Sequence, residues 1–496
     1  MSAQTASASG ASVPGPATDP PPSRDLQPPS RDLWEDRGIR AALLVVAALA
    51  LVILLGTVYG AFQGGISTAF SAFDLGGVVV LAVLGGVVLL VILLAGRRAA
   101  DRRLRHTLLF TGAAATVVAL LLWLALLPMV MVLAFSESLV FCVLPTAFAF
   151  WLLRRIQPTR RLPWSMLLLA AAWGMLIAPS LALTSEQLYS SLTASLIPGL
   201  GAGVAGAFSP GLFEEGAKGL GVVVLYLVFR DRIDGVIGGL CLGAAVGLGF
   251  NFLETGEYMF IGGIQGLSVG GFVLQLALRQ GIGLLLGHAA YTALIGAGLG
   301  VARSVRGWAP KTIAIAAGFA AAIAGHYLWD MVAMTNLAPS SGNDIIDLFV
   351  LTPLQYIVLD GPFAMMSVAL LVLGWRTEGN AVQRRLEAEA ASGRGVVVAS
   401  ELPVLTSPRR RAGMRLRALW RSSWRHYRWI VQIQDAQLEM AMLRWHAAHG
   451  RIDLERAQLR DRALQDRILA LKQRAPRRLS LARRPRKKAA SANAAR

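Results

Sequence analysis

The chain has 496 residues, of which 55% are hydrophobic and only 16% are charged. A soluble domain carries about 25% charged residues, and several apolar runs here exceed the roughly 18 residues that indicate a membrane helix. The composition therefore excludes an ordinary soluble enzyme and predicts an all-α, polytopic integral membrane protein of the cell membrane. The formal net charge is +19. Because this excess lies in loops and in the C-terminal tail, no specific nucleic-acid partner is expected.

The N-terminal segment, residues 1–36, is rich in Ser, Ala and Pro and cannot bury enough apolar surface to fold, so it is predicted to be a disordered leader. The first apolar run begins near Ala41 and has no small-residue cleavage pattern, which favours a signal anchor over a cleaved signal peptide. Cys142 and Cys241 both lie in apolar runs and are expected to be small buried hydrophobic residues.

The apolar runs predict about ten membrane helices. They are expected near residues 41–62, 75–96, 107–127, 131–153, 164–183, 211–229, 235–254, 280–301, 312–333 and 355–374.

Basic residues fall in every second loop between these helices. The basic loops contain Arg97, Arg98, Arg102, Arg103 and Arg105; Arg154, Arg155, Arg160 and Arg161; Arg230 and Arg232; and Arg303, Arg306 and Lys311. The intervening loops 63–74, 184–208 and 334–354 contain no Lys or Arg. By the positive-inside rule both termini are predicted to be cytoplasmic, which agrees with an even number of helices.

The composition divides the chain into six segments. They are the leader 1–36, N-terminal membrane helices 37–158, a membrane core 159–376, a basic linker 377–428, an amphipathic helix 429–474 and a polybasic end 475–496. The basic tail is predicted to contact anionic lipid at the inner membrane surface or to hold a cytoplasmic partner, for example through a coiled coil.

One stretch, Ser209–Lys218, places two carboxylates and an amine at the beginning of an apolar helix. Ser209 is a typical N-cap and Pro210 a typical first helical residue, so the helix is predicted to begin there. Glu214 and Glu215 would then lie in the first two turns, where the helix dipole favours negative charge. Lys218 lies one turn beyond Glu214 on the same face, where the two can pair.

Further polar residues occur within the C-terminal membrane helices. Glu254 ends the seventh predicted helix with Glu257 beyond it, and His288 lies in the eighth. His326 and Asp330 lie in the ninth, and their i, i+4 spacing puts both on one face. Ionisable residues inside a membrane usually face a protein interior or a water-filled cavity and mark functional sites.

The depth of these residues gives a test that is independent of their type. At about 1.5 Å per residue, Glu214, His288 and His326 lie roughly 22–24 Å from the basic residues at the cytoplasmic ends of their helices. Glu254 lies about 30 Å from Asp234. In a hydrocarbon core of about 30 Å, all four residues occupy the outer part, which favours one shared site.

Each of these features also has a structural interpretation. A lone membrane histidine is often a helix-to-helix hydrogen-bonding residue, and Glu214 and Lys218 could form a structural ion pair. Arg279 and Asp360 lie near helix ends and are expected to be ordinary interfacial residues. Gly238–Gly239 and Gly296–Gly300 are expected to permit close helix packing, not to bind phosphate.

A dry site with two glutamates, two histidines and a lysine supports hydrolysis of a peptide bond. A buried carboxylate can take a proton from water and later return it, and an imidazole can stabilise the oxyanion that forms. The same groups could bind zinc, with a glutamate activating the bound water, although no His-Glu-x-x-His motif is present. A proton-coupled transporter is the non-enzymatic alternative, because membrane Glu and His residues also relay protons; a non-catalytic membrane scaffold is another.

The ordered set of motifs resembles the PrsW family of intramembrane proteases, relatives of the CAAX-processing and bacteriocin-processing membrane endopeptidases. The matching residues are Glu214-Glu215-x-x-Lys218, Phe250-x-x-x-Glu254, His288 and His326-x-x-x-Asp330. The resemblance covers roughly residues 160–376 and excludes the leader, the first helices and the tail.

The resemblance implies a bacterial protease that cleaves membrane-anchored proteins; in the founding case the substrate is an anti-sigma factor cut on its extracytoplasmic side. It implies that Glu214 or Glu215 activates water with help from Glu254, while His288 and His326 support the water or the oxyanion. Asp330 would orient His326, and Lys218 belongs to the same catalytic set. No cofactor is expected from the glutamate mechanism. A zinc-dependent version would use His288, His326 and Glu254 as ligands.

Overall fold

The computed structural model describes residues 117–474, apart from gaps at 119–120, 123, 126, 197–201, 231, 266–268, 336, 338, 450–451 and 453. Every element in this part of the chain is helical and none is a strand, which confirms the predicted all-α class. The elements up to residue 359 are α4 (Ser136–Arg155), α5 (Trp164–Ala172), η3 (Trp173–Ile177), α6 (Ala178–Leu196), α7 (Ala202–Phe229), α8 (Val236–Met259), η4 (Phe260–Gln265), α9 (Val269–Gln275), η5 (Leu276–Ile282), α10 (Gly283–Leu286), α11 (His288–Ser304), α12 (Trp308–Met334), α13 (Asp344–Ile346), η6 (Asp347–Leu351) and α14 (Thr352–Leu359).

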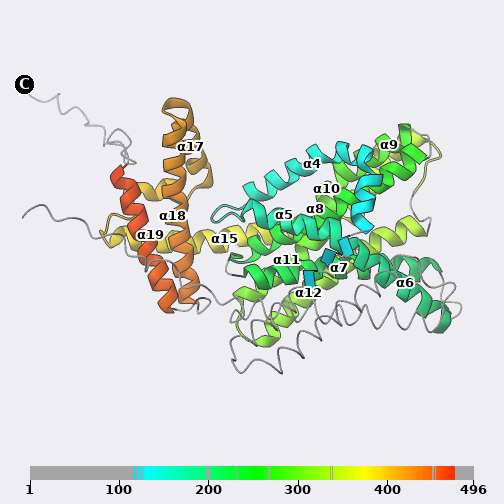
Figure 1. Ribbon diagram of the computed structural model, residues 1–496, viewed down its shortest axis with the longest axis horizontal. Helices are drawn as coiled ribbons and strands as arrows, with labels where there is room; N and C mark the ends of the chain where they lie inside the picture. Colours follow the sequence, from blue (N-terminus) through cyan, green and yellow to red (C-terminus); the bar gives the residue numbers. More distant parts are fainter. Residues whose placement is uncertain are drawn as a thin grey trace, which may run out of the picture.

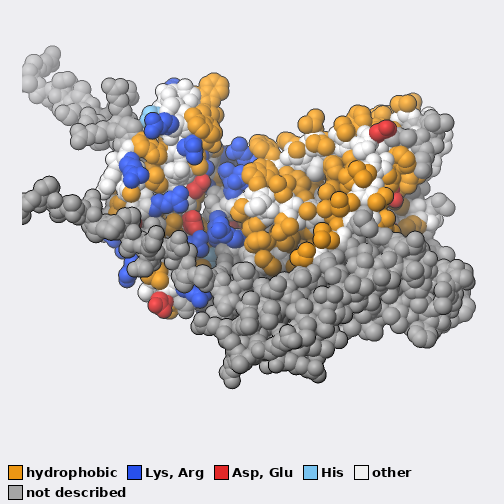
Figure 2. Space-filling view, viewed as in Figure 1, with side chains coloured by type: hydrophobic (Ala, Val, Ile, Leu, Met, Phe, Trp, Pro, Cys, Tyr) orange, Lys and Arg blue, Asp and Glu red, His pale blue; other side chains and the backbone are white. Residues whose placement is uncertain are grey.

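The remaining helices form the C-terminal part of the chain. They are α15 (Gly361–Ala391), η7 (Ala399–Glu401), α16 (Leu402–Leu405), α17 (Pro408–Arg421), α18 (Trp424–Ala448) and α19 (Leu454–Arg474). Figure 1 shows a large helical body from α4 to α14 and a smaller bundle of α17, α18 and α19, with the long helix α15 running from one to the other. Apolar side chains cover the visible described surface of the large body, whereas Lys and Arg gather on the bundle and at the junction (Figure 2).

Several helices of the large body are long and apolar enough to cross a membrane, as expected of a multi-pass membrane protein. Five such stretches are Ser136–Arg155, Trp164–Gln187, Val236–Gly263, Val269–Ser304 and Trp308–Met334, and Phe349–Leu359 with Gly361–Ala391 makes a sixth if this pair, bent by 51°, is one span. The predicted spans 41–62 and 75–96 lie outside the described residues. The total of ten helices and the cytoplasmic position of both termini therefore remain predictions.

Helix α8 lies in the core of the large body and packs against α11 at unusually short range. A Cβ atom added to Gly239 would lie 2.1 Å from the carbonyl oxygen of Gly296, and one added to Gly247 would lie 2.3 Å from that of His288. Only glycine permits such an approach, because any side chain would collide with the opposite backbone. The predicted close packing is confirmed for Gly239, Gly296 and Gly300, whereas Gly238 faces only Ile233. The contact at Gly247, which was not predicted, sets His288 against α8.

Helix α7 begins earlier than predicted. It starts at Ala202, so Ser209 is not its N-cap and Pro210 lies in the helix interior. Glu214 and Glu215 consequently lie in the fourth turn, too far from the helix start for the dipole to stabilise them. Proline is tolerated within membrane helices because neighbouring helices can compensate for the lost backbone bond. Here α12 packs closely against the next residue, with the backbone nitrogen of Tyr327 3.0 Å from the Cβ position of Gly211.

The C-terminal helices form a second hydrophobic core. Helix α15 extends to Ala391, and the segment 377–428, predicted as a linker, contains the end of α15 together with α16 and α17. The segment 429–474, predicted as one amphipathic helix, instead forms α18 and α19, which pack against each other. Leu386 of α15, Met440 of α18 and Ile468 of α19 are fully buried in this core. The hydrophobic stripes of these helices thus cover one another.

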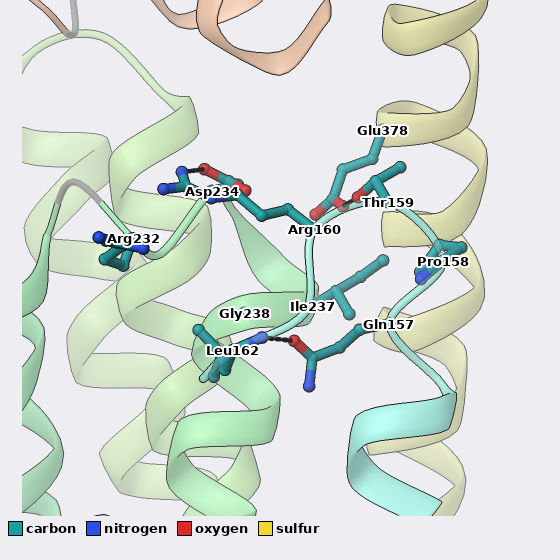
Figure 3. A pocket seen from close by; sticks show the side chains of 10 residues that line it. All are labelled: Gln157, Pro158, Thr159, Arg160, Leu162, Arg232, Asp234, Ile237, Gly238 and Glu378. Carbon is teal, nitrogen blue, oxygen red and sulfur yellow. Dashed lines mark hydrogen bonds and ion pairs between the residues drawn. The ribbon is translucent and has the colours of Figure 1, made fainter. Parts of the chain in front are cut away.

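The bundle contacts the large body through polar groups at the end of α4 and the α7–α8 loop. Asp234 accepts hydrogen bonds from His446 Nε2 of α18 at 2.9 Å and from Arg160 Nη1 at 3.1 Å. Figure 3 shows the small cavity beside these groups, where Thr159 donates to Glu378 of α15 at 3.3 Å. These bonds hold the beginning of the bundle against one end of the membrane helices.

Candidate active site

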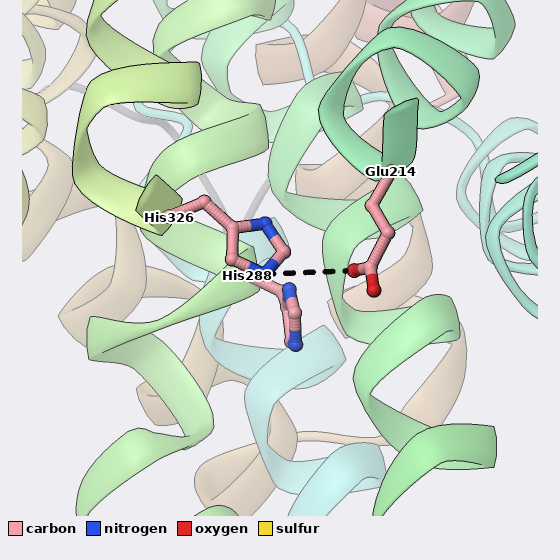
Figure 4. Close-up of side chains that lie close together, drawn as sticks. All are labelled: Glu214, His288 and His326. Carbon is pink, nitrogen blue, oxygen red and sulfur yellow. Dashed lines mark ion pairs between the residues drawn. The ribbon is translucent and has the colours of Figure 1, made fainter. Parts of the chain in front are cut away.

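The seven residues predicted to form a site come together from four helices. Helix α7 supplies Glu214, Glu215 and Lys218, α8 supplies Glu254, α11 begins with His288, and α12 supplies His326 and Asp330. Figure 4 shows Glu214, His288 and His326 pointing toward one another from three of these helices. The polar residues of the four helices, which were predicted to lie at one depth, are therefore in direct contact.

Lys218 lies at the centre of this cluster and its side chain has no exposed surface. Its Nζ lies 2.6 Å from Glu215 Oε1, 3.3 Å from Glu214 Oε2 and 2.9 Å from His288 Nδ1. The ammonium also lies 4.1 Å from the centroid of the Phe250 ring, a cation–π contact. A buried charge requires such compensation. The expected pairing of Lys218 with Glu214 is present, and the pairing with Glu215 is shorter.

Glu215 is fully buried and its oxygens are already occupied. Besides the ion pair with Lys218, Oε1 lies 3.1 Å from His326 Nδ1, and Oε2 accepts a hydrogen bond from Thr292 Oγ1 at 3.0 Å. With its side chain 0% exposed, Glu215 has no surface for water or substrate. It acts in the structure as a brace between α7, α11 and α12.

Glu214 differs from its neighbour in access and in partners. Its side chain is 16% exposed, and its contacts are longer: 3.3 Å to Lys218 Nζ and 3.6 Å from Oε2 to His326 Nε2. The adjacent positions of the two glutamates place them about 100° apart around α7, so one faces the packed core and the other the partly open side. Glu214 is therefore the carboxylate of this pair that can meet a water molecule.

His288 is held at both ring nitrogens. Lys218 can only donate a hydrogen bond, so it donates to Nδ1, and the imidazole proton belongs on Nε2. His288 Nε2 lies 2.5 Å from Glu254 Oε2, and the same oxygen lies 3.0 Å from Arg279 Nη1. Arg279 and Glu254 thus form an ion pair behind His288 that fixes the orientation of its ring.

His326 is buried, and its second ring nitrogen faces two carboxylates. Its Nε2 lies 3.4 Å from Asp330 Oδ2, one helical turn away, and 3.6 Å from Glu214. Asp330 Oδ2 is buried and forms no hydrogen bond of good geometry with any described residue. Among these three residues, Asp330 Oδ2 is thus the buried polar atom without a hydrogen bond to a described residue, and the Glu214 side chain beside His326 is 16% exposed, as expected where a substrate or water binds.

Four further residues of the site were not predicted from the sequence. Thr292 bonds to Glu215, and the ring of Tyr291 stacks on His326 with a centroid separation of 5.7 Å while its hydroxyl donates to Asp360. Arg279 and Asp360, expected to be interfacial, instead lie against the site, and Asp360 is only 1% exposed. Tyr291 and Thr292 stand three and four positions after His288, on its helix face, and this spacing was the available signal. For Arg279 and Asp360 the sequence offered no such signal.

Three of these side chains could hold a metal ion. One ligand atom each of Glu214, His288 and His326 lies within 4.8 Å of the others. This set contains Glu214 where Glu254 was predicted, because Glu254 is engaged by Arg279 and His288. Two imidazoles and a carboxylate match the ligands of catalytic zinc by type and number. The ammonium of Lys218, 2.9 Å from His288 Nδ1, does not fit a cation bound at that nitrogen.

Together the helices and this buried carboxylate–imidazole cluster define a polytopic membrane protein with a polar site inside its helical core. Residues 162–359 match the PrsW family intramembrane metalloproteases, which confirms the resemblance predicted from the motifs over nearly the same region. The match includes every residue of the cluster up to Asp330 and ends just before Asp360. It indicates an intramembrane protease that acts on membrane proteins. No curated protein and no solved structure matches this chain.

Proposed function

We propose that this protein is an intramembrane endopeptidase of the glutamate type, with Glu214 as the general base. The observation that carries the proposal is the unequal environment of the two adjacent glutamates: Glu215 is fully buried and held by three partners, whereas Glu214 is 16% exposed and lies 3.6 Å from His326 Nε2. The match of residues 162–359 to the PrsW family supports the peptidase class.

In the proposed reaction, Glu214 takes a proton from a water molecule as the water oxygen attacks the carbonyl carbon of the scissile peptide bond. A C–O bond forms and the carbonyl oxygen becomes an oxyanion. When the tetrahedral intermediate collapses, the C–N bond breaks and Glu214 returns the proton to the leaving amine. Such a carboxylate acts first as base and then as acid, so no net proton is consumed.

His326 is the residue placed to stabilise the oxyanion. Its Nδ1 is oriented by Glu215, and when it carries both ring protons its Nε2 can donate toward the space beside Glu214. His288 has no free nitrogen in this arrangement. We assign His288, Glu254 and Lys218 to positioning: they fix the charge and geometry around Glu214 and Glu215. Asp330 and Tyr291 position His326.

The substrates that we propose are membrane-anchored proteins, such as anti-sigma factors, cleaved in the outer part of the bilayer. The site lies about 22 Å along α11 and α12 from Arg303 and Lys311, the basic residues at the opposite ends of those helices. Both termini are proposed to be cytoplasmic on the same positive-inside argument. Cleavage would then release the outer portion of a membrane-anchored substrate.

A zinc-dependent reaction is the second candidate, favoured by the proximity of Glu214, His288 and His326 and by the description of the family as metalloproteases. These three residues would hold the ion, which would supply an activated water and polarise the scissile carbonyl. Binding at His288 would require Lys218 or Glu254 to move from its nitrogen. We therefore derive no step through the metal.

The test is cleavage by the purified full-length enzyme of proteins in isolated membranes, scored as new N-termini by mass spectrometry. Wild type is compared with Glu214→Gln, His326→Ala and the control Glu137→Gln, which changes an exposed carboxylate at the start of α4. Each is assayed with and without a zinc chelator. We expect Glu137→Gln to match wild type, the two site variants to lose activity, and the chelator to have no effect.

Loss of wild-type activity in chelator, restored by added zinc, would replace the glutamate mechanism with the metal one. Undiminished cleavage by both site variants would show that the active site lies elsewhere in the chain. A proton flux across reconstituted vesicles that Glu214→Gln abolishes, without any cleavage by wild type, would instead identify a transporter.

A further inference from the structure

A second polar site lies at the other end of α11 and α12, where the two helices are joined by residues 305–307. A cavity of about 470 Å³ opens there, bounded by these helices, by Tyr226 of α7 and by His449 at the end of α18. Its volume lies within the range of small-molecule sites, about 300–1,000 Å³. It is separated from His288 and His326 by about 22 Å of helix, so it does not belong to the active site.

The charge in this cavity is of one sign. Arg303, Arg306 and Lys311 line it, and none of the described residues that line it is acidic. None of the three forms an ion pair with any residue that the structure describes. Arg303 Nε is buried and has no hydrogen-bond partner among those residues. A buried guanidinium nitrogen without a partner is costly, and an anionic ligand would satisfy it.

The beginning of α12 strengthens this requirement. Its N-cap is Gly307, no side chain caps its first amide groups, and no acidic residue lies in its first turn. Lys311 lies there instead, where the positive end of the helix dipole disfavours a cation. An anion at this position would compensate both the free amides and the lysine. The uncapped start of α12 with Lys311 in its first turn is thus unfavourable when the cavity is empty and favourable when an anion is bound.

The walls of the cavity indicate an amphiphile. Leu299, Ala302 and Ile315 face it together with the ring of Tyr226. Val269–Ser304 and Trp308–Met334 both qualify as membrane spans, so the turn between them lies at a membrane surface. Basic pockets between membrane helices at this level bind phospholipid head groups.

We propose that this cavity binds a phosphate-bearing anion, with the head group of an anionic phospholipid as its natural occupant. The three cations would contact the phosphate while the apolar wall would receive the first part of the acyl chains. Because His449 belongs to the C-terminal bundle, the bound lipid would touch α11, α12 and α18 together. The site would thereby join the bundle to the membrane surface.

The test uses the full-length protein in a neutral detergent and native mass spectrometry. The probes are dioleoylphosphatidylglycerol, dioleoylphosphatidylcholine with the same chains, and inorganic pyrophosphate. The variant replaces Arg303, Arg306 and Lys311 by Gln. The matched control replaces three exposed arginines of α17, Arg409, Arg417 and Arg421, by Gln, which removes the same charge.

We expect wild type and the control to retain one phosphatidylglycerol. The cavity variant should bind it about a hundredfold more weakly, because each lost cation weakens binding about fivefold. Binding of pyrophosphate alone, lost only in the cavity variant, would support the phosphate site and assign it to a soluble compound. Equal binding by the cavity variant and the control, or equal binding of phosphatidylcholine, would overturn the proposal.

Folding of the variant is checked separately by its unfolding temperature without lipid. If the triple variant does not fold, Arg306→Gln with Lys311→Gln replaces it, because both side chains are exposed. For this pair the expected weakening is about 25-fold. Unchanged binding by the double variant would equally overturn the proposal.

Discussion

At the scale of single residues, Glu214 and Glu215 are neighbouring carboxylates with different surroundings, and we propose different roles for them. Both contact Lys218, yet Glu215 is sealed by Thr292 and His326 whereas Glu214 retains exposed surface. A general base must have access to a water molecule, whereas a residue that holds helices together must be fixed by its partners. The proposed roles therefore rest on access and hydrogen bonding, because the two residues carry the same charge.

This difference predicts opposite effects of two conservative substitutions. Glu215→Gln removes the nearest counter-charge of a fully buried ammonium, so it should lower the free energy of unfolding by about 3 kcal/mol. Glu214→Gln should change it by less than about 1 kcal/mol while reducing cleavage by at least about 100-fold. Thermal unfolding and the cleavage assay on the same preparations measure both. An unstable Glu214→Gln protein beside a stable Glu215→Gln protein would reverse the assignment.

Tyr291 provides a second test at this scale. Tyr291→Phe keeps the ring that stacks on His326 but removes the hydroxyl that donates to the buried Asp360. We expect the free energy of unfolding to fall by about 1–3 kcal/mol, because the buried Asp360 carboxylate loses its hydrogen-bond donor. Tyr327→Phe is the control: Tyr327 is half-buried, and its hydroxyl donates to the sulfur of Met331 at 3.0 Å, not to a buried carboxylate of the described chain. Equal losses in the two variants would mean that the Asp360 bond is not important.

At the scale of the elements, the close contact of α8 and α11 places the site residues of both helices. A Cβ atom at Gly243 would lie 2.2 Å from the carbonyl oxygen of Thr292, the residue that bonds Glu215. We expect Gly243→Ala to push the helices apart and to lower the free energy of unfolding by about 1–3 kcal/mol. It should also reduce the rate of cleavage. Gly216→Ala on α7 is the control, because nothing lies within 4 Å of its Cβ position. It should be neutral or slightly stabilising. Unimpaired cleavage by Gly243→Ala would show that the helix contact does not set the active geometry.

At the scale of the whole molecule, the long helix α15 connects the membrane body to the C-terminal bundle. Glu389 near its end is fully buried, 2.5 Å from Arg394 and from Arg444 of α18. Burial acts to raise the pKa of Glu389, but the hydrogen bonds from Arg394 and Arg444 outweigh it and hold the pKa below its ordinary value of 4.5. The salt bridge thus adds stability above about pH 4.5 that is lost as the pH falls through the lowered value.

The expected result is a decrease in the unfolding temperature of the wild-type protein as the pH is lowered from 7 to about 3, beginning near the ordinary glutamate pKa of about 4.5. Glu389→Gln should be less stable at pH 7 and should show a smaller decrease, since it no longer has this carboxylate to protonate. Scanning fluorimetry at several pH values measures both. Glu439→Gln, which changes the more exposed acid that pairs with Arg460, should behave like wild type. Parallel curves for wild type and Glu389→Gln would exclude this salt bridge as the cause.

The sequence by itself determined the class of this protein and predicted seven polar residues that the structure brings together. Long apolar runs can satisfy their backbone groups in a membrane only as helices, and a charged residue is tolerated there only with partners. Those two constraints were enough to select Glu214, Glu215, Lys218, Glu254, His288, His326 and Asp330 from the chain. The glycines of α8 and α11 were also predictable, because they alternate with apolar residues on helices that must pack.

Only the tertiary structure decided which of these residues are sealed by partners and which remain partly exposed. The start of α7 at Ala202, the burial of Glu215 and the use of both His288 nitrogens depend on what the neighbouring helices place against them. Arg279 and Asp360 lie at the site because helices distant in the sequence pack there. The local sequence pattern around each residue does not predict this packing. The tail folds into a bundle for the same reason: each helix has an apolar stripe, but only packing shows that the stripes cover one another and not a lipid surface.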